Sequence, residues 1–275
     1  MKSLQLAAAA LAALAMSNSA PAVAQETKTA PPATIKLWRL DCGRLDENGA
    51  RPWAWQKVPT PCPCYLVQHG NRYLLWDAGI SRRGLGNAHP VAKLDRTISD
   101  QLAQIGVRPE QIEFIGISHY HGDHTGQATQ FPKARMLIGK GDLDALKASP
   151  APGGAAPPHV QPWLDGSAPV EALTEDKDIF GDGRVIMLRT PGHTPGHSSL
   201  LVKLATGPVI LTGDLWFNHE AAMTGTMPEF NTSRAETLAS RDRISRMVEN
   251  LDAVVIIQHE PADIAKLPAF PESAQ

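Results

Sequence analysis

The hydrophobic residues of this chain fall into short runs from Ile35 onward, and Gly, Pro or Asp separates one run from the next. Short apolar runs with such boundaries are typical of buried β-strands. We therefore expect strands in the segments IKLWRL, CYLVQH, RYLLWDAG, FIGISH, RMLIG, RVIMLRT, PVILTGD and AVVIIQH.

Helices are expected between these runs, at residues 97–105, 141–148 and 235–251. The last segment follows Ser233, a residue type that favours the N-cap. Its apolar residues recur on one face, with Arg and Glu opposite: Leu238, Ile244, Met247 and Leu251. Strands that alternate with helices predict a layered α/β domain.

The N-terminus has a different pattern. Lys2 precedes an Ala- and Leu-rich run at 4–16, and the small residues AVA end at Ala24. This order predicts a signal peptide over residues 1–24 that is cleaved after Ala24. The run is too short to span a bilayer, so we expect a periplasmic or secreted protein without stable membrane association. Residues 25–34 read as a flexible lead-in, and 35–275 as a single domain.

The charge composition argues against one class of partner, nucleic acid. The 26 basic and 28 acidic side chains give a net charge of −2, and no basic stripe is present, so no nucleic-acid partner is expected. In an oxidising compartment the three cysteines permit one disulfide, from Cys42 to either Cys62 or Cys64. The remaining thiol is expected in the core, and no cysteine stands at metal-ligand spacing from the histidines. Histidine itself is frequent, with ten residues.

Four of the candidate ligands lie in the segment HYHGDH, after the apolar run FIGIS. His119 and His121 share a face while the backbone is extended, so both can contact one cation. Gly122 permits a sharp turn that directs Asp123 and His124 to a second point. Three imidazoles and a carboxylate in six residues predict a cation between them.

Three more donors, His193, Asp214 and His259, each follow an apolar run. Open α/β sheets place their sites at the carboxyl ends of strands. Five histidines and two aspartates suit Zn²⁺ or another divalent metal such as Fe, Co or Mn. Seven donors exceed the needs of one tetrahedral ion, so the sequence predicts two metals per chain.

The motifs HYHGDH, TPGHTPGH, TGD and QHE together resemble the signature of the metallo-β-lactamase superfamily. The resemblance covers about residues 35–270 and implies an αββα sandwich with a dinuclear site between its two sheets. It also implies the ligands of each metal: His119, His121 and His193 for the first, Asp123, His124 and His259 for the second, and Asp214 as the bridge.

Within that superfamily the sequence is most similar to the N-acyl-homoserine lactonases, through KLWRLDCG, LLWDAG, SHYHGDHTG and TPGHTPGHSSLLV. True β-lactamases of this fold generally lack a carboxylate at the position of Asp214. The resemblance therefore implies a small-molecule lactone substrate, whose ring is opened by a metal-bridging hydroxide that the catalytic residue Asp123 orients. The alternatives are a β-lactamase, another ester or thioester hydrolase, and a metal-binding protein without turnover.

One departure concerns the substrate. These lactonases often have Tyr three residues after the bridging Asp, and here that residue is Phe217. Trp216, Asn218 or His219 could supply the missing polar group. Alternatively, Phe217 forms an apolar wall for an acyl chain. We expect Phe217 and Trp216 to contact the substrate.

His197 and Asp77 are expected to hold metal ligands by hydrogen bonds, with a plain turn role equally open for Asp77. Tyr120 is expected to pack. The Pro-rich segment 148–162 reads as a loop or lid. We expect the rings of three further histidines to be solvated: His69, His89 and His159. Trp53 and Trp55 are expected either to line the substrate entrance or to lie in the core.

Overall fold

The computed structural model describes residues 33–45, 59–81 and 92–275. The predicted signal peptide and most of the lead-in lie outside the described residues, as do Trp53, Trp55 and His89. The described residues belong to one unit, Ala33–Gln275.

The first sheet has the strand order β1-β4-β5-β7-β8-β9. β1, β4 and β5 are antiparallel, whereas β5, β7, β8 and β9 run parallel to one another. The bounds of its strands are β1 Ile35–Leu40, β4 Cys64–His69, β5 Arg72–Trp76, β7 Ile112–Ile117, β8 Arg135–Gly139 and β9 Val170–Leu173.

The second sheet has the order β10-β11-β12-β13-β14, antiparallel except for its last pair. Its strands are β10 Lys177–Asp178, β11 Val185–Arg189, β12 Ser198–Leu204, β13 Gly207–Leu211 and β14 Val254–Ile256. A small third sheet pairs β3 and β6 with β2: β2 Arg44–Leu45, β3 Thr60–Pro61 and β6 Ala92–Lys93.

The α-helices of the described chain are α1 Ile98–Gln104, α2 Gly122–Thr125, α3 Lys140–Lys147, α4 Gln161–Leu164, α5 His219–Thr224, α6 Arg234–Leu251 and α7 Pro261–Ile264. Local sequence sets their ends. Thr97 and Asp100 form a capping box that starts α1, and the Ser233 side chain accepts a hydrogen bond from the N–H of Glu236 at the start of α6.

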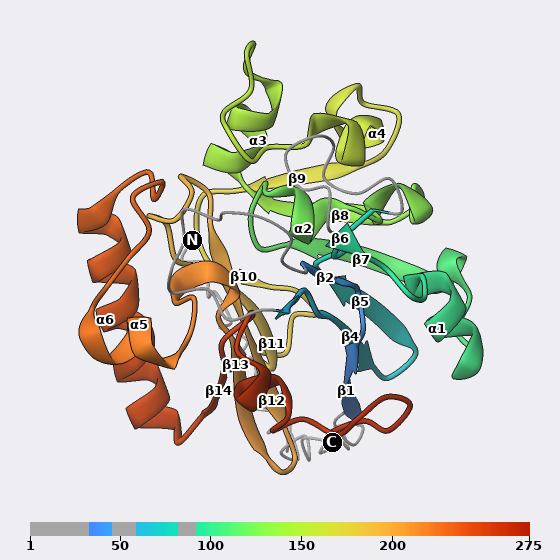
Figure 1. Ribbon diagram of the computed structural model, residues 1–275. Helices are drawn as coiled ribbons and strands as arrows, with labels where there is room; N and C mark the ends of the chain where they lie inside the picture. The colour runs from blue at the N-terminus through green and yellow to red at the C-terminus, as the bar shows by residue number, and fades with distance from the viewer. Residues whose placement is uncertain (1–32, 46–58, 82–91) are drawn as a thin grey trace, which may run out of the picture. The chain divides into compact units, whose positions relative to one another are not determined.

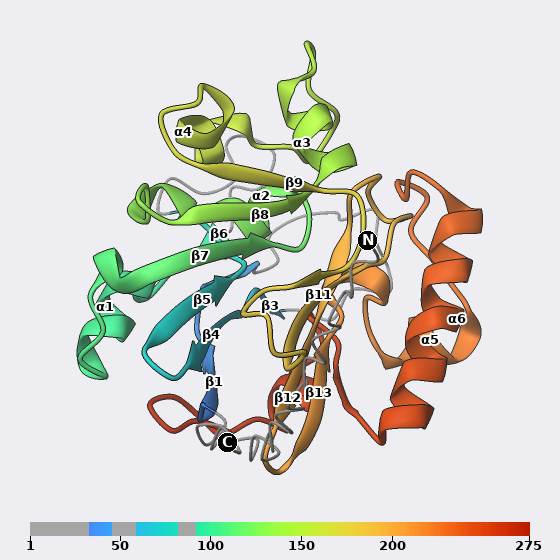
Figure 2. The ribbon, with the colours of Figure 1, turned by 180° about the vertical axis from the view of Figure 1, so that it is seen from behind.

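The two large sheets face each other, with α1 against the outer face of the first sheet and α6 against that of the second (Figures 1 and 2). Alternate residues of a strand point to opposite faces, and the packing follows this rule. Leu66 packs toward the outer helices, whereas Val67 lies in the core between the sheets. Leu211 lies in that same core, whereas Ile210 packs with Ile244 of α6. The expected αββα sandwich is confirmed.

The pattern located eight strands of the two large sheets and three helices to within a few residues, but it missed β9 and β12. The sequence of β12, SSLLVKL, begins with two polar residues, although both are buried. The expected face of α6 is also wrong in part, because Leu238 is 47% exposed. Polar residues replace it on the buried side, where the Arg241 Nε donates to the carbonyl of Leu215.

Cys42 is bonded to Cys64, which resolves the two alternatives and leaves Cys62 as a buried free thiol. Within the described residues, no helix has the length and hydrophobicity needed to cross a bilayer.

Candidate metal centre

The predicted donors from the first half of the chain follow strand β7. His119 and His121 lie in the extended segment directly after it, and the short helix α2 carries Asp123 and His124. A hydrogen bond from the N–H of Gly122 to the carbonyl of Gly154 holds the start of α2.

The second sheet supplies the remaining donors. His193 follows β11, Asp214 follows β13 and His259 follows β14. The structure brings these side chains together with the donors that follow β7, so that all seven predicted ligands meet at one edge of the two sheets.

A first cluster contains His119, His121, His193 and Asp214. The Nδ1 atom of His121 lies 2.9 Å from the Nε2 of His119 and 3.1 Å from the Nε2 of His193. The Oδ2 atom of Asp214 lies 3.8 Å from the Nε2 of His119 and 3.6 Å from that of His193.

A second cluster contains His124, His259 and the same Asp214. Here the other carboxylate oxygen, Oδ1, lies 3.3 Å from the Nε2 of His124 and 3.2 Å from that of His259. The Oδ2 atom of Asp123 lies 3.8 Å from each of these two nitrogens. Asp214 thus directs one oxygen to each cluster, as a bridging carboxylate requires.

Hydrogen bonds at the outer nitrogens fix the orientation of these rings. The Nδ1 of His124 donates to Asp77 at 2.9 Å, and that of His259 donates to the carbonyl of Pro61 at 2.8 Å. The Nδ1 of His193 donates to the Oδ1 of Asn231 at 2.9 Å. A neutral ring that donates from Nδ1 has its lone pair on Nε2, and in all three the Nε2 points into the cluster.

These residues fit a bound cation. The Nε2 of His124 and the Oδ1 of Asp214 are buried, and neither has a hydrogen-bond partner. In the neutral ring just described both atoms are acceptors, and two acceptors that face each other at 3.3 Å repel unless a proton or a metal cation lies between them. The donor set of imidazole nitrogens and carboxylate oxygens suits Zn²⁺ and similar divalent ions.

Charges differ between the two clusters. Burial above all lowers the pKa of His121 to about 3 and that of His193 to about 4, so both rings are neutral, as metal ligands must be. Burial also lowers the pKa of His124 and His259, but Asp214 and its neighbouring groups raise both values well above the usual range. The carboxylate bridge therefore attracts positive charge to the second cluster.

Asp77 and His197 form hydrogen bonds to predicted metal ligands, Asp77 to His124 and His197 to Asp214, as expected from the sequence. Asp77 accepts hydrogen bonds from the N–H and the hydroxyl of Ser118 at 2.7 and 2.9 Å, as well as from His124. His197 accepts a hydrogen bond from the N–H of Asp214 at 3.0 Å, and its Nδ1 donates to the carbonyl of Thr190. His197 is thus a support for Asp214.

A family model described as the metallo-beta-lactamase superfamily matches residues 58–259. The chain belongs to this superfamily. Among its curated relatives is the N-acyl homoserine lactonase AttM of Rhizobium radiobacter, 28% identical over 86% of this chain and 98% of the relative. An N-acyl homoserine lactonase of a Bacillus species is 27% identical over the same shares of the two chains.

Solved structures agree with the metallo-beta-lactamase fold. An N-acyl homoserine lactone hydrolase, with N-hexanoyl-L-homoserine bound at its catalytic metal centre, superposes with a TM-score of 0.73 at 20% identity. The match covers 88% of this chain and 100% of that one. The dizinc lactonase AidC superposes with a TM-score of 0.60 at 18% identity, over 90% and 92% of the two chains.

Sequence reasoning missed a cysteine in this metallo-beta-lactamase superfamily member. Cys62 is buried, as expected for the remaining thiol, but its sulfur also clusters with donor atoms of Asp123 and His259, which the sequence did not suggest. Burial raises the pKa of this thiol to about 11. Spacing along the chain could not reveal it, because Cys62 and His259 are brought together only by the fold.

Asn231 and Asp142 were also missed. The carboxylate of Asp142 accepts hydrogen bonds from the N–H of Tyr120, the hydroxyl of Thr194 and the N–H of Gly196. It thereby joins the two loops that carry the first cluster. Tyr120 itself is buried and packs, as expected.

Around the clusters, Phe217 lies with its ring centroid 5.8 Å from those of both His193 and His259. Phe230, which the sequence did not single out, lies 6.0 Å from Phe217 and 5.6 Å from His193. Trp216 instead lies in the hydrophobic cluster beneath α6. The Nε2 of His219 pairs with Asp263 at 2.7 Å.

Two histidines expected to be solvated are not. The ring of His69 stacks on Phe180 at 4.5 Å, and its Nε2 bonds to Asp182 at 2.7 Å. The Nδ1 of His159 lies 3.2 Å from the hydroxyl of Thr125, whose proton goes to the carbonyl of His121. Part of the Pro-rich segment is therefore docked on the metal-binding loop, and it ends in a 3₁₀ turn, Pro157–Val160, and α4.

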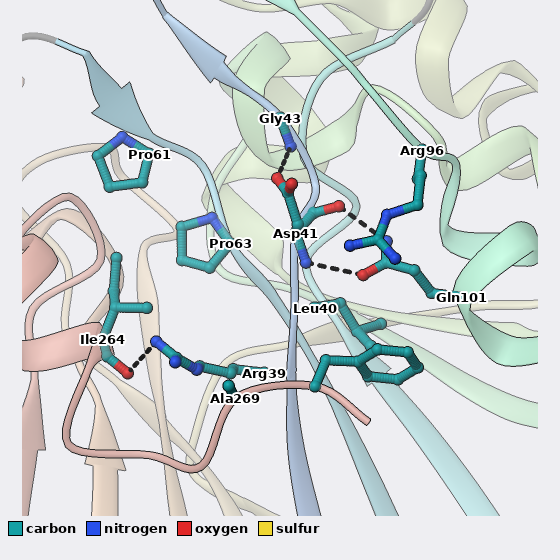
Figure 3. Close-up of a pocket in the computed structure, with 11 residues that line it drawn as sticks. Arg39, Leu40, Asp41, Gly43, Pro61, Pro63, Arg96, Gln101, Ile264 and Ala269 are labelled. Atoms are coloured by element: carbon teal, nitrogen blue, oxygen red, sulfur yellow. Dashed lines mark hydrogen bonds between the residues drawn. The ribbon is translucent and has the colours of Figure 1, made fainter. Parts of the chain in front are cut away.

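A separate cavity of about 320 Å³ is lined by residues such as Arg39, Asp41 and Gln101 (Figure 3). None of the seven predicted ligands lines it. The Gln101 side chain is paired with the backbone of Asp41, which accounts for its burial at this wall. The predicted metal centre therefore lies outside this cavity, although Pro61 and Pro63 on its wall flank Cys62.

Proposed function

We propose that the protein is a dinuclear metal-dependent hydrolase that opens the ring of N-acyl-homoserine lactones. The observation that carries the proposal is the position of Asp214, whose two oxygens face different clusters. The curated relatives from Rhizobium radiobacter and a Bacillus species, which match 86% of this chain, are N-acyl homoserine lactonases by name, and this favours a lactone as substrate.

Two divalent cations bound at these clusters would lower the pKa of a shared water and polarise the ester carbonyl. His119, His121 and His193 would hold the first, Asp123, His124 and His259 the second, and Asp214 both. The donor set and the dizinc character of the neighbour AidC support zinc as the metal.

Asp123 has the chemistry of a proton carrier. Its side chain is 16% exposed, whereas that of Asp214 is 3% exposed, so Asp123 is the more open of the two carboxylates to water and substrate. We assign it the orientation of the attacking water, acceptance of its proton and transfer of that proton to the departing ring oxygen.

The acyl chain needs an apolar surface beside the reacting carbonyl. Phe217 and Phe230 form such a surface, because both rings contact His193. Phe217 has no hydroxyl, so bound cations would have to supply the interaction that a tyrosine would make with the substrate oxygen. This arrangement favours an amphipathic substrate with a hydrocarbon chain over a compact polar one.

A substrate panel on the whole zinc-loaded chain tests the proposal. We expect hydrolysis of acyl-homoserine lactones and little cleavage of a chromogenic cephalosporin. A glutathione thioester should not be hydrolysed faster than the lactones. Asp123→Asn should lower kcat by on the order of 10²-fold or more. Glu113→Gln, which removes a half-exposed carboxylate paired with Arg72 on β5, is the matched control and should leave kcat unchanged. Cleavage of the cephalosporin without lactone opening would overturn the assignment.

Export remains part of the proposal. The Cys42–Cys64 disulfide supports it, because such bonds persist mainly in oxidising compartments. N-terminal sequencing of the chain recovered from the periplasm or medium should begin at Gln25. A mature chain that retains residues 1–24 would contradict cleavage.

A further inference from the structure

Cys62 is held at the metal centre by contacts on both sides of it in the sequence. The carbonyl of Pro61 accepts a hydrogen bond from His259 at 2.8 Å, and the carbonyl of Pro63 accepts one from the side chain of Gln258 at 2.7 Å. Because Gln258 and His259 are adjacent, the two bonds fix the segment around Cys62 against the turn that follows β14.

The side chain of Cys62 faces the second cluster. Its sulfur, a carboxylate oxygen of Asp123 and a ring nitrogen of His259 all lie within 4.8 Å of one another. Thiolate sulfur, carboxylate oxygen and imidazole nitrogen are the three donor types that zinc binds in proteins. This group shares Asp123 and His259 with the second cation position, so the sulfur adjoins that position.

This thiol is available as a ligand. The sequence has three cysteines, and the disulfide takes Cys42 and Cys64. Cys62 is fully buried, which protects it from oxidants and other thiols in solution.

Packing alone accounts for only part of this environment. Cys62 contacts Leu45 and Ile80 in a small apolar cluster, and its sulfur lies 3.8 Å from the carbonyl of Thr60. An apolar core position does not explain why the sulfur also approaches a carboxylate and an imidazole. A cation accounts for it, and a cation would also satisfy two buried atoms of the adjoining cluster that have no hydrogen-bond partner, His124 Nε2 and Asp214 Oδ1.

We propose that Cys62 is a further protein ligand of the second cation, bound through sulfur. On cation uptake the S–H bond breaks, the sulfur–metal bond forms with the sulfur lone pair, and the proton leaves to solvent. A sulfur donor at this position favours zinc, cobalt and cadmium over the harder manganese and magnesium ions. This assignment rests on the proposed dinuclear centre, because it adds a ligand to the second of its two positions.

Cobalt spectroscopy tests the proposal without an activity measurement. The whole chain, freed of metal and with its disulfide intact, is titrated with Co²⁺ while visible and near-ultraviolet absorption are recorded. A thiolate bound to Co²⁺ gives an intense charge-transfer band in the near ultraviolet, which imidazole and carboxylate ligands lack. Because Cys62 is the single free cysteine, the unmodified chain alone can give the answer.

We expect the charge-transfer band to grow with the second equivalent of Co²⁺ and to be absent in Cys62→Ser. The variant should also bind the second ion at least about 10-fold more weakly, with little change at the first. Cys62→Ala, which keeps an apolar contact with Ile80, separates loss of the ligand from loss of packing. It should bind the second ion as weakly as Cys62→Ser.

The outcomes distinguish the two proposals. Two bound Co²⁺ ions without a charge-transfer band would overturn the role of Cys62 and leave the dinuclear centre in place. Uptake of a single Co²⁺ would overturn both. If Cys62→Ser fails to fold, the band of the unmodified chain, and its loss when Zn²⁺ displaces Co²⁺, still decides the question.

Discussion

His124 donates its Nδ1 proton to the carboxylate of Asp77 over 2.9 Å, and both side chains are fully buried. Asp77 has a left-handed backbone with φ of 59°, and it also accepts two hydrogen bonds from Ser118. This contact decides which nitrogen of His124 faces the second cation position. A residue 47 positions away in the sequence therefore sets the chemistry of a ligand.

Asp77→Asn is expected to weaken the second cation position. Asn tolerates the left-handed backbone, but its amide N–H₂ would oppose the Nδ1 proton of His124 and favour the tautomer with hydrogen on Nε2. Loss of such a supporting contact costs about 10–100-fold in metal affinity. Competition with a chelating dye measures this, and Glu113→Gln serves as the control. Unchanged affinity at both positions would show that Asp77 does not orient the ring.

Gly154 is expected to be essential to the first cluster. A Cβ atom there would lie 2.5 Å from Cδ2 of His121, and the backbone φ is +81°. Gly154→Ala should therefore displace the ring, with a loss of about 1–3 kcal/mol in the free energy of unfolding from overpacking. The first cation should bind more weakly in the same variant.

The adjacent Gly153 offers a matched control, since a Cβ there meets nothing within 4 Å. Urea unfolding and dye competition on Gly153→Ala should match the unmodified chain. Equal behaviour of the two variants would refute a packing role for Gly154.

Sequence alone located all seven predicted ligands, four from their local spacing and three from their positions after apolar runs. His119 and His121 share a face of an extended segment, and this rule needs no knowledge of the fold. Cys62 and Asn231 escaped notice because their partners, His259 and His193, come from other strands. No spacing rule connects residues that only tertiary packing brings together.

Tertiary contacts also explain the error in α6. Amphipathic periodicity placed Leu238 on the buried face, but it is 47% exposed. Ser240 donates instead to the carbonyl of Pro191 at 2.8 Å, and Arg241 to that of Leu215 at 2.9 Å. The helix thus turns polar groups toward the loops that carry His193 and Asp214. The hydrophobic pattern of the helix cannot reveal these contacts, because they are made by polar side chains.

Phe217 can be tested by two opposite changes. Phe217→Leu loses ring contacts with His193, His259 and Phe230, so KM for long-chain lactones should rise about 2–10-fold with little change in kcat. Phe217→Tyr adds a hydroxyl donor beside the clusters. It should raise kcat by about 10-fold, which is less than the roughly 10²- to 10³-fold effect of a well-placed hydrogen-bond donor on kcat. Steady-state kinetics over several acyl lengths would contradict the apolar wall if KM for Phe217→Leu were the same at every length.

Asp142 provides a pH-dependent contribution to stability. Burial raises its pKa to about 7, and hydrogen bonds from Thr194, Gly196 and Tyr120 oppose that rise only in part. The ordinary value is 3.8, so between these limits the folded chain binds a proton that the unfolded chain has released. Stability from this group is therefore greatest at low pH and is lost as pH rises through about 7.

Urea unfolding of the metal-free chain and of Asp142→Asn, each at pH 5 and pH 8, isolates this effect because the other titrating groups are common to both. Between pH 8 and pH 5, the unmodified chain should gain about 2–3 kcal/mol relative to the variant. At each pH the variant should also be the less stable, since its amide cannot accept all three hydrogen bonds. A difference between the two chains that is the same at both pH values would mean that Asp142 stays ionised, and that its hydrogen bonds outweigh its burial.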